Sequence, residues 1–218
     1  MKPLRILIAD DHDLLRRGVR ALLQSHAGWE ICGEANTGRE AVAKAEELKP
    51  DIVVLDISMP DLNGVEAARR IRKASAGTEV LVLSMHYSDQ LIREILDAGV
   101  RGYIVKSDSD RDLTIAVETL AKHKPFFTPH ATEVILSKFN TGGPVTKVPE
   151  LIRERLTPRE REIVQLLAEG KSSKDVASSL CISVKTAETH RANIMRKLEL
   201  HSVSALVRFA VRNQIIEA

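Results

Sequence analysis

Cysteine, aromatic side chains and long apolar runs are all scarce in this sequence of 218 residues. Its two cysteines, Cys32 and Cys181, are too few and too far apart for a disulfide framework or a cysteine metal site. We interpret both as small core residues. Only 3% of the residues are aromatic while 44% are hydrophobic, a composition that excludes general disorder. The longest apolar runs are the length of strands, which excludes a membrane-spanning helix.

The N-terminal segment MKPLRILIADD has neither the apolar core nor the small-residue cleavage site of a signal peptide. We therefore expect a cytoplasmic protein that has no membrane partner. The sequence contains no repeat and no low-complexity tract. Its length suits two small domains, each able to bury a core.

Charge divides unevenly along the chain although the net charge is only +2. Residues 151–218 contain 12 Lys or Arg and 8 Asp or Glu, an excess of four positive charges. The preceding residues contain 20 Lys or Arg and 22 Asp or Glu, an excess of two negative charges. A basic C-terminal part is consistent with a polyanion partner, and an ordinary solvated surface explains it equally well.

Short apolar runs alternate with amphipathic helical patterns over the first 123 residues, which indicates an α/β fold. Because the runs are apolar throughout, we predict a doubly wound, five-stranded parallel sheet with helices on both faces. The predicted strands are Leu4–Ala9, Trp29–Ala35, Ile52–Leu55, Val80–Leu83 and Gly102–Val105, and the predicted helices cover 13–25, 38–48, 64–74, 88–98 and 109–123.

Turn-forming residues then separate this region from a second one. A short helix near 130–138 precedes residues 140–149, which have no periodicity and are typical of a flexible linker. Helical signals return at Thr157, which can form a capping box with Glu160. Further helices are predicted at 173–180, 184–198 and 202–212, so the second domain is all-α with four helices. We divide the chain into domains 1–125 and 153–218, joined by residues 126–152.

Polar side chains follow the predicted strands at one edge of the sheet. Asp10 and Asp11 end the first strand, Asp56 ends the third, and Ser84 and Lys106 end the fourth and fifth. In such sheets ligands bind outside the carboxyl ends of the strands. Each residue alone could be a strand cap or a turn residue, but five at corresponding positions predict a functional site.

Three carboxylates brought together require protonation or a cation, and oxygen ligands suit Mg²⁺. Asp10, Asp11 and Asp56 could share the ion together with the backbone carbonyl of Ser58. One oxygen of Asp56 would remain free to attack phosphorus and form an aspartyl phosphate. The Lys106 charge would then face the phosphoryl oxygens.

Ser84 could donate its hydroxyl to a phosphoryl oxygen. Taken together, residues 4 to 123 resemble the receiver domain of two-component response regulators. The resemblance depends on Asp10-Asp11, Asp-Ile-Ser-Met-Pro at 56–60, Gly64, Ser84, and Tyr103 three residues before Lys106. It implies a flavodoxin-like receiver, a Mg²⁺ requirement, and phosphorylation of Asp56 by a sensor histidine kinase.

The same resemblance implies that Ser84 and Tyr103 reorient when the phosphate arrives. A half-buried aromatic ring with its hydroxyl in water is the alternative for Tyr103. Many receivers have proline after the lysine, whereas Ser107 follows Lys106 here, so a cis peptide is not expected at that position.

The predicted helix at 184–198 has two different faces. Ala187, His190, Ile194 and Leu198 can pack inward. The opposite face is polar, small and cationic, and it could either enter a major groove or be an ordinary solvated face.

Residues 156–218 resemble the LuxR-type helix-turn-helix domain through Leu-Thr-Pro-Arg-Glu at 156–160, Ala-Glu-Gly at 168–170 and Ser-Val-Lys-Thr-Ala-Glu-Thr-His at 183–190. The whole chain is therefore similar to the NarL/FixJ subfamily of transcription factors. The resemblance implies base readout by Glu188, Thr189 and Ala192. The implied phosphate contacts are Lys185, Thr186, Arg191, Arg196 and Lys197.

We predict a DNA-binding transcriptional regulator that is activated by phosphorylation and forms homodimers on double-stranded DNA. No enzymatic activity is expected beyond phosphoryl transfer to Asp56 and its loss. The last helix, with Val203 and Leu206 on one side, could add to the dimer interface or pack within its own domain. A Mg²⁺-dependent, Asp-based phosphohydrolase is one alternative, although Ser58 stands where a second acid would be needed. A constitutive DNA-binding regulator with a vestigial receiver is another.

Overall fold

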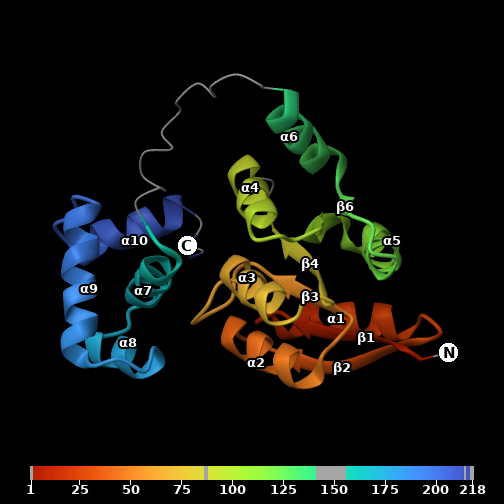
Figure 1. Ribbon diagram of the computed structural model, residues 1–218, viewed down its shortest axis with the longest axis horizontal. Coiled ribbons are helices and arrows are strands. Elements are labelled where there is room, and N and C mark those ends of the chain that lie inside the picture. Colours follow the sequence, from red (N-terminus) through yellow and green to blue (C-terminus); the bar gives the residue numbers. More distant parts are fainter. Residues whose placement is uncertain (1, 86–87, 141–155, 214, 217–218) are drawn as a thin grey trace. The chain divides into compact units, whose positions relative to one another are not determined.

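The computed structural model describes residues 2–85, 88–140, 156–213 and 215–216, without the side chains of 108–111 and 138–140. The chain divides into two compact units, Met1–Gly143 and Pro144–Ala218 (Figure 1). Most of the predicted linker lies outside the described residues.

A parallel sheet forms the centre of the first unit, with strand order β2-β1-β3-β4-β5-β6. The strands are β1 (Leu4–Ala9), β2 (Trp29–Ala35), β3 (Ile52–Asp56), β4 (Glu79–Ser84), β5 (Gly102–Val105) and β6 (Phe126–Phe127). The prediction of five strands was wrong by one, because β6 has only two residues. Such a segment has no periodicity of its own, and it becomes a strand only by pairing with Gly102 and Tyr103 of β5.

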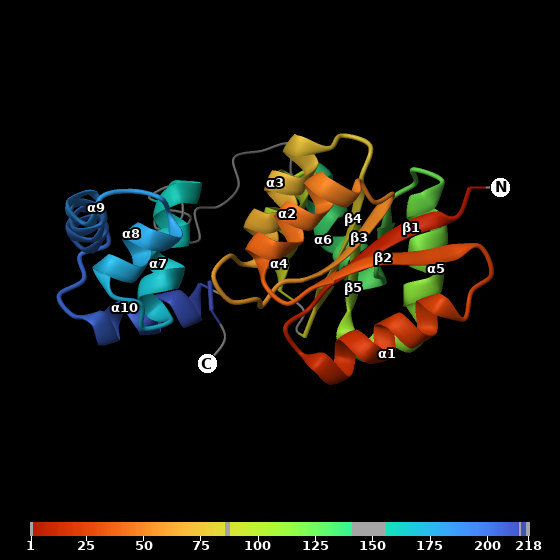
Figure 2. The ribbon, with the colours of Figure 1, turned by 90° about the horizontal axis from the view of Figure 1, so that it is seen from below.

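Helices cover both faces of this sheet (Figure 2). On one face, α1 (Asp13–Gln24) and α5 (Ser109–Ala121) bury Val19, Leu23 and Leu113 against the strands. On the other face lie α2 (Gly38–Leu48), α3 (Gly64–Ala74), α4 (Asp89–Asp97) and α6 (Pro129–Asn140). The predicted ranges match these helices within two residues, which confirms the doubly wound α/β class.

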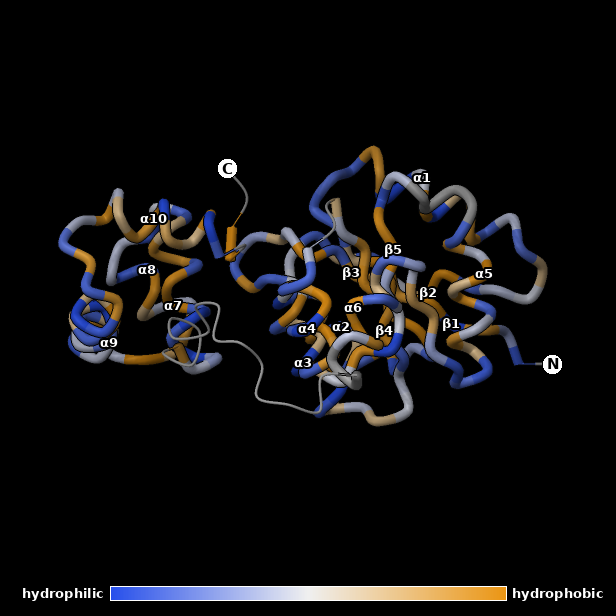
Figure 3. The backbone as a smooth tube through the Cα atoms, turned by 90° about the horizontal axis from the view of Figure 1, so that it is seen from above, coloured by the Kyte–Doolittle hydropathy of each residue, from blue (hydrophilic) through white to orange (hydrophobic). Residues whose placement is uncertain are grey.

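Apolar residues occupy both faces of the inner strands, as the uninterrupted sequence runs predict. Every residue of β3 and β4 is buried, and the tube coloured by hydropathy shows these strands as hydrophobic (Figure 3). A strand that is covered on both sides cannot alternate apolar and polar residues, because both faces lie in the core.

The second unit consists of α7 (Pro158–Ala168), α8 (Ser173–Ser179), α9 (Val184–Lys197) and α10 (Val203–Arg212). Its core includes Ile163, Val176, Ile194 and Leu206. The predicted capping box is present at the start of α7, where Thr157 and Glu160 exchange side-chain-to-backbone hydrogen bonds. The four predicted helices of the C-terminal domain are therefore confirmed.

The two cysteines differ in burial. Cys32 is partly buried and packs against the core of the first unit. Cys181 is exposed in the turn between α8 and α9, so its interpretation as a core residue was wrong. Its backbone has a φ of 51°, which shows that this position serves the tight turn between the two helices rather than apolar packing.

None of the helices in the described part of the chain is both long enough and apolar enough to cross a membrane.

Candidate functional site

The predicted acidic residues lie where the strand order of the sheet reverses. β1 pairs with β2 on one side and with β3 on the other, and Ala9 is in register with Leu55. Asp10 and Asp56, each one residue further on, therefore emerge side by side at the carboxyl ends of their strands. This edge is the expected ligand-binding position of a doubly wound sheet.

Lys106 joins the two acids across the end of β4. Its Nζ lies 3.0 Å from Asp10 Oδ2 and 2.8 Å from Asp56 Oδ2. Both carboxylates are only 1% exposed and Lys106 is 8% exposed. The structure thus brings together the three charged groups predicted from strands one, three and five. Burial of one unpaired charge would be costly, so these groups depend on one another.

Burial also changes how these groups bind protons. It raises the pKa of Asp56, an effect that Lys106 counteracts and that Asp10 reinforces. Burial alone would lower the pKa of Lys106, but its two carboxylate partners outweigh that effect and raise this pKa. Lys106 therefore remains a cation beside Asp56 at neutral pH.

His12 completes the site and was not among the predicted residues. Its Nδ1 lies 3.0 Å from Asp11 Oδ1 and 3.3 Å from Asp10 Oδ1, while 4.0 Å separates it from Asp56 Oδ2. One ligand atom from each of these four residues can be chosen so that all lie within 4.8 Å of one another. The only sequence signal was an imidazole directly after the acid pair. We call Asp10, Asp11 and Asp56 the acidic cluster; its oxygens are ligands that Mg²⁺ accepts.

Gly64 packs directly beneath Asp56. Its backbone N–H donates to the carbonyl of Ile57 over 2.7 Å. A Cβ on Gly64 would lie 2.0 Å from the backbone oxygen of Asp56, so any larger residue would displace the end of β3. The Asn63 side chain caps α3 by accepting from Glu66 N and so holds the loop from the other side.

Ser84 and Tyr103 are both buried in the first unit. Ser84 is 5% exposed at the end of β4, and Tyr103 on β5 is fully buried. The alternative of a half-buried Tyr103 with its hydroxyl in water was therefore wrong, because β6 and α6 cover this edge of the sheet. The backbone N–H of Ser58 donates a hydrogen bond to the Asp56 carboxylate. The bond between Lys106 and Ser107 is trans, since no cis peptide occurs in the described residues.

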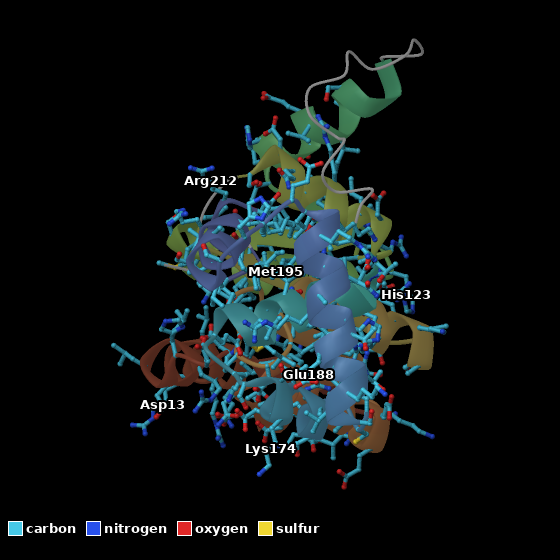
Figure 4. The ribbon with its side chains drawn as sticks, turned by 90° about the vertical axis from the view of Figure 1, so that its left-hand side faces the viewer. Asp13, His123, Lys174, Glu188, Met195 and Arg212 are labelled. Carbon is cyan, nitrogen blue, oxygen red and sulfur yellow. The ribbon has the colours of Figure 1, made fainter. Side chains whose placement is uncertain are left out.

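On α9 the inward and outward faces agree with the predicted periodicity. Ala187 and Ile194 are buried, and His190 and Leu198 are partly buried. The exposed predicted contacts are Lys185, Thr186, Glu188, Thr189, Ala192 and Arg196. Figure 3 shows α9 as mostly hydrophilic, and Figure 4 shows Glu188 and Met195 along its length.

Hydrogen bonds within the domain constrain some of these side chains. The Thr189 hydroxyl donates to the Lys185 carbonyl over 2.8 Å, which engages the hydroxyl with the helix backbone. Lys197 Nζ lies 2.7 Å from Glu160 Oε2 on α7. Lys197 is therefore tied to its own domain, unlike the exposed Lys185.

The fold and the site define a receiver domain followed by a helix-turn-helix domain, and comparison with known proteins agrees. Residues 6–118 match the response regulator receiver domain, and residues 154–210 match the bacterial regulatory proteins of the luxR family. The response regulator protein VraR of Staphylococcus aureus is 37% identical over 98% of this chain and 99% of its own. The chain therefore belongs to the two-component response regulators with a LuxR-type DNA-binding domain.

Solved structures share this fold over all or part of the chain. A LuxR-family two-component response regulator from Aurantimonas is 30% identical, with a TM-score of 0.59 over 63% of this chain and 99% of that one. RcsB from Salmonella enterica serovar Typhimurium, bound to a promoter with the phosphomimetic BeF₃⁻, has a TM-score of 0.61. It is 24% identical over 95% of this chain and 98% of its own, so it supports the fold.

Proposed function

We propose that this response regulator accepts a phosphoryl group on Asp56 from a sensor histidine kinase and that the acylphosphate activates DNA binding. The observation that carries the proposal is the placement of Asp56, which is buried beside Asp10 and 2.8 Å from Lys106 at the switch point of the sheet. A carboxylate that could act as a nucleophile, a cation and oxygens that could bind a metal ion meet there.

In the proposed transfer an Asp56 oxygen forms a bond to phosphorus as the bond from phosphorus to the donor histidine nitrogen breaks, with the electron pair leaving on nitrogen. Mg²⁺, held by Asp10, Asp11, Asp56 and the Ser58 carbonyl, would supply charge neutralisation for the phosphoryl oxygens. Lys106 already spans Asp10 and Asp56, so a small movement of its Nζ would pair it with a phosphoryl oxygen.

Ser84 and Tyr103 are the proposed switch residues. Ser84 would donate its hydroxyl to the phosphoryl group, and Tyr103 would move with it. Tyr103 shares its core with Ala131 and Val134 of α6, the last described helix before the linker. A change in the packing of Tyr103 would therefore reach the chain segment that leads to the second domain.

The second part of the proposal is that α9 reads DNA and that the active species is a homodimer. Lys185, Thr186, Arg191 and Arg196 would contact phosphates, whereas Glu188, Thr189 and Ala192 would face bases. Lys197 remains a phosphate candidate only if it leaves Glu160. Leu206 of α10 packs in its own core, while Val203 is 45% exposed and open to a partner.

Phosphate incorporation from acetyl phosphate tests the first part of the proposal. We expect intact-mass spectra to show one Mg²⁺-dependent phosphoryl adduct on the wild-type chain and none on Asp56→Asn. Asp11→Asn should retain the nucleophile but require far more Mg²⁺. A stable, Mg²⁺-dependent adduct on Asp56→Asn would show that another residue is the acceptor.

A further inference from the structure

His12 occupies a position where the sequence makes an unusual choice. Among the described residues, seven helices begin with a residue whose side chain accepts a capping hydrogen bond from the helix backbone: Thr37, Asn63, Ser88, Thr157, Ser172, Ser183 and Ser202. At the start of α1 the equivalent residue is His12, whose side chain makes no capping hydrogen bond. Helix starts favour Ser, Thr, Asp or Asn, so α1 forgoes a stabilising cap. Local rules are most often broken at functional sites.

The imidazole of His12 points into the acidic cluster instead. Its Nδ1 lies 3.0 Å from an oxygen of Asp11 and 3.3 Å from an oxygen of Asp10. Around an octahedrally coordinated ion with metal-ligand bonds of about 2.1 Å, adjacent ligand atoms are about 3.0 Å apart and opposite ligand atoms about 4.2 Å. The 4.0 Å between Nδ1 and Asp56 Oδ2 is close to the second value. The distances from His12 Nδ1 to the three carboxylates are therefore close to those between two ligands of one octahedral ion.

The backbone holds His12 in this position. Its N–H donates to Asp10 Oδ1 over 2.8 Å, which fixes the turn between β1 and α1. The His12 side chain is 58% exposed, while those of Asp10 and Asp56 are 1% exposed. The cluster therefore has two buried carboxylates at its base and an imidazole at its solvent side.

Building on the proposed metal site, we infer that His12 Nδ1 is an additional ligand that adapts this receiver to divalent first-row transition ions. Mg²⁺ prefers oxygen ligands and keeps several waters, so it gains little from an imidazole. Ions such as Fe²⁺, Co²⁺, Ni²⁺ and Zn²⁺ bind imidazole well, so one nitrogen among carboxylates shifts the preference of the site toward them.

A simple hydrogen bond from His12 to the carboxylates would place the ring at similar distances. The two explanations differ in metal selectivity. A hydrogen-bonding His12 affects every ion through the same carboxylates, whereas a ligand affects only the ions that bind nitrogen.

Co²⁺ and Mg²⁺ binding to the full-length chain at one fixed pH separates them. By calorimetry we expect His12→Ala to raise the Kd for Co²⁺ at least about tenfold, the lower end of the cost of losing even an outer-shell partner. The Kd for Mg²⁺ should change far less. In proton NMR spectra of the Co²⁺ complex, a strongly shifted imidazole resonance should be present in the wild type and absent from His12→Ala.

His201→Ala is the matched control, because it removes an exposed imidazole from the other unit. It should leave both Kd values and the shifted resonance unchanged. Asp11→Asn should weaken both ions, and Co²⁺ binding that survives it unchanged would place the ion elsewhere and overturn the inference. Equal losses for Co²⁺ and Mg²⁺ in His12→Ala would overturn it as well. A wild-type chain that binds neither ion would instead refute the proposed metal site.

Discussion

The packing of Gly64 against Asp56 allows a quantitative test of how the backbone positions the proposed phosphoacceptor. In Gly64→Ala the new Cβ would lie 2.0 Å from the Asp56 carbonyl oxygen and 2.8 Å from the Ile57 Cα. Since Cβ contacts below 3.0 Å essentially never occur, the end of β3 and the start of α3 must separate by about 1 Å. That movement also strains the 2.7 Å hydrogen bond from Gly64 N to Ile57 O.

The expected loss of stability follows from these two contacts. Overpacking costs about 1–3 kcal/mol and a weakened hydrogen bond about 1 kcal/mol, so the first unit should lose roughly 2–4 kcal/mol. A displacement of about 1 Å at a reacting group can slow a reaction about a hundredfold. Phosphorylation of Asp56 by acetyl phosphate should therefore slow much more than partial unfolding alone would explain.

Trp29 is the single tryptophan of the chain and lies on β2, so its fluorescence reports urea unfolding of the first unit alone. For Gly64→Ala the urea midpoint should fall by about 1–2 M, given slopes of about 1–3 kcal/mol per M. The matched control is Gly38→Ala, whose Cβ would lie 1.9 Å from the Leu62 carbonyl oxygen. It should destabilise the same unit without moving Asp56.

Phosphorylation rates in low urea then separate stability from placement. Gly64→Ala should be slow and Gly38→Ala close to the wild type. Equal rates in both variants would refute a special role of Gly64 beneath Asp56. A Gly64→Ala chain with wild-type stability and rate would refute the packing argument itself.

Three further predictions concern other parts of the chain. Gly18 is exposed in α1 with open space around its Cα, so Gly18→Ala should raise the urea midpoint of the first unit by the equivalent of about 0.5–1 kcal/mol; a fall would contradict this. Burial raises the pKa of Glu160, but hydrogen bonds from Lys197 and from the helix cap outweigh that effect, so the pKa is lowered in the folded chain. Glu160 therefore stabilises the fold above its unfolded-state pKa, and this contribution is lost as the pH falls through the lower folded-state pKa. Glu160→Gln keeps the cap, should cost about 0.5–1 kcal/mol at pH 7 by helix dichroism, and should match the wild type in strong acid; a deficit that persists there would exclude the ion pair as its cause. In salt titrations of DNA binding, Lys185→Ala should reduce the salt slope by about one on any sequence, whereas Glu188→Ala should relax one base preference by ~1–3 kcal/mol; unchanged slopes and an unchanged preferred site would exclude α9 as the reader.

Local patterns in the sequence were enough to predict most helices and strands and the positions of the charged residues along them. Continuous apolar runs predict strands covered on both faces, and the 3.6-residue period predicts helices, because both patterns are local consequences of burial. The acids Asp10 and Asp56 could be placed at one edge from the sequence alone, since parallel strands present their carboxyl ends together. The capping box at Thr157 could be predicted for a similar reason, because it involves residues only three apart.

Contacts between distant segments, which no period encodes, depended on the tertiary structure. β6 is too short to show a pattern and exists through its pairing with β5, and its arrival with α6 buries Tyr103. The ion pair between Lys197 and Glu160 joins residues 37 positions apart in the sequence. The sequence alone cannot show that Lys197, which the resemblance assigns to DNA phosphates, is paired with a carboxylate of its own domain. His12 and Gly64 acquire their roles from three-dimensional proximity to Asp56, because distances between separate strands and turns depend on how the whole sheet packs.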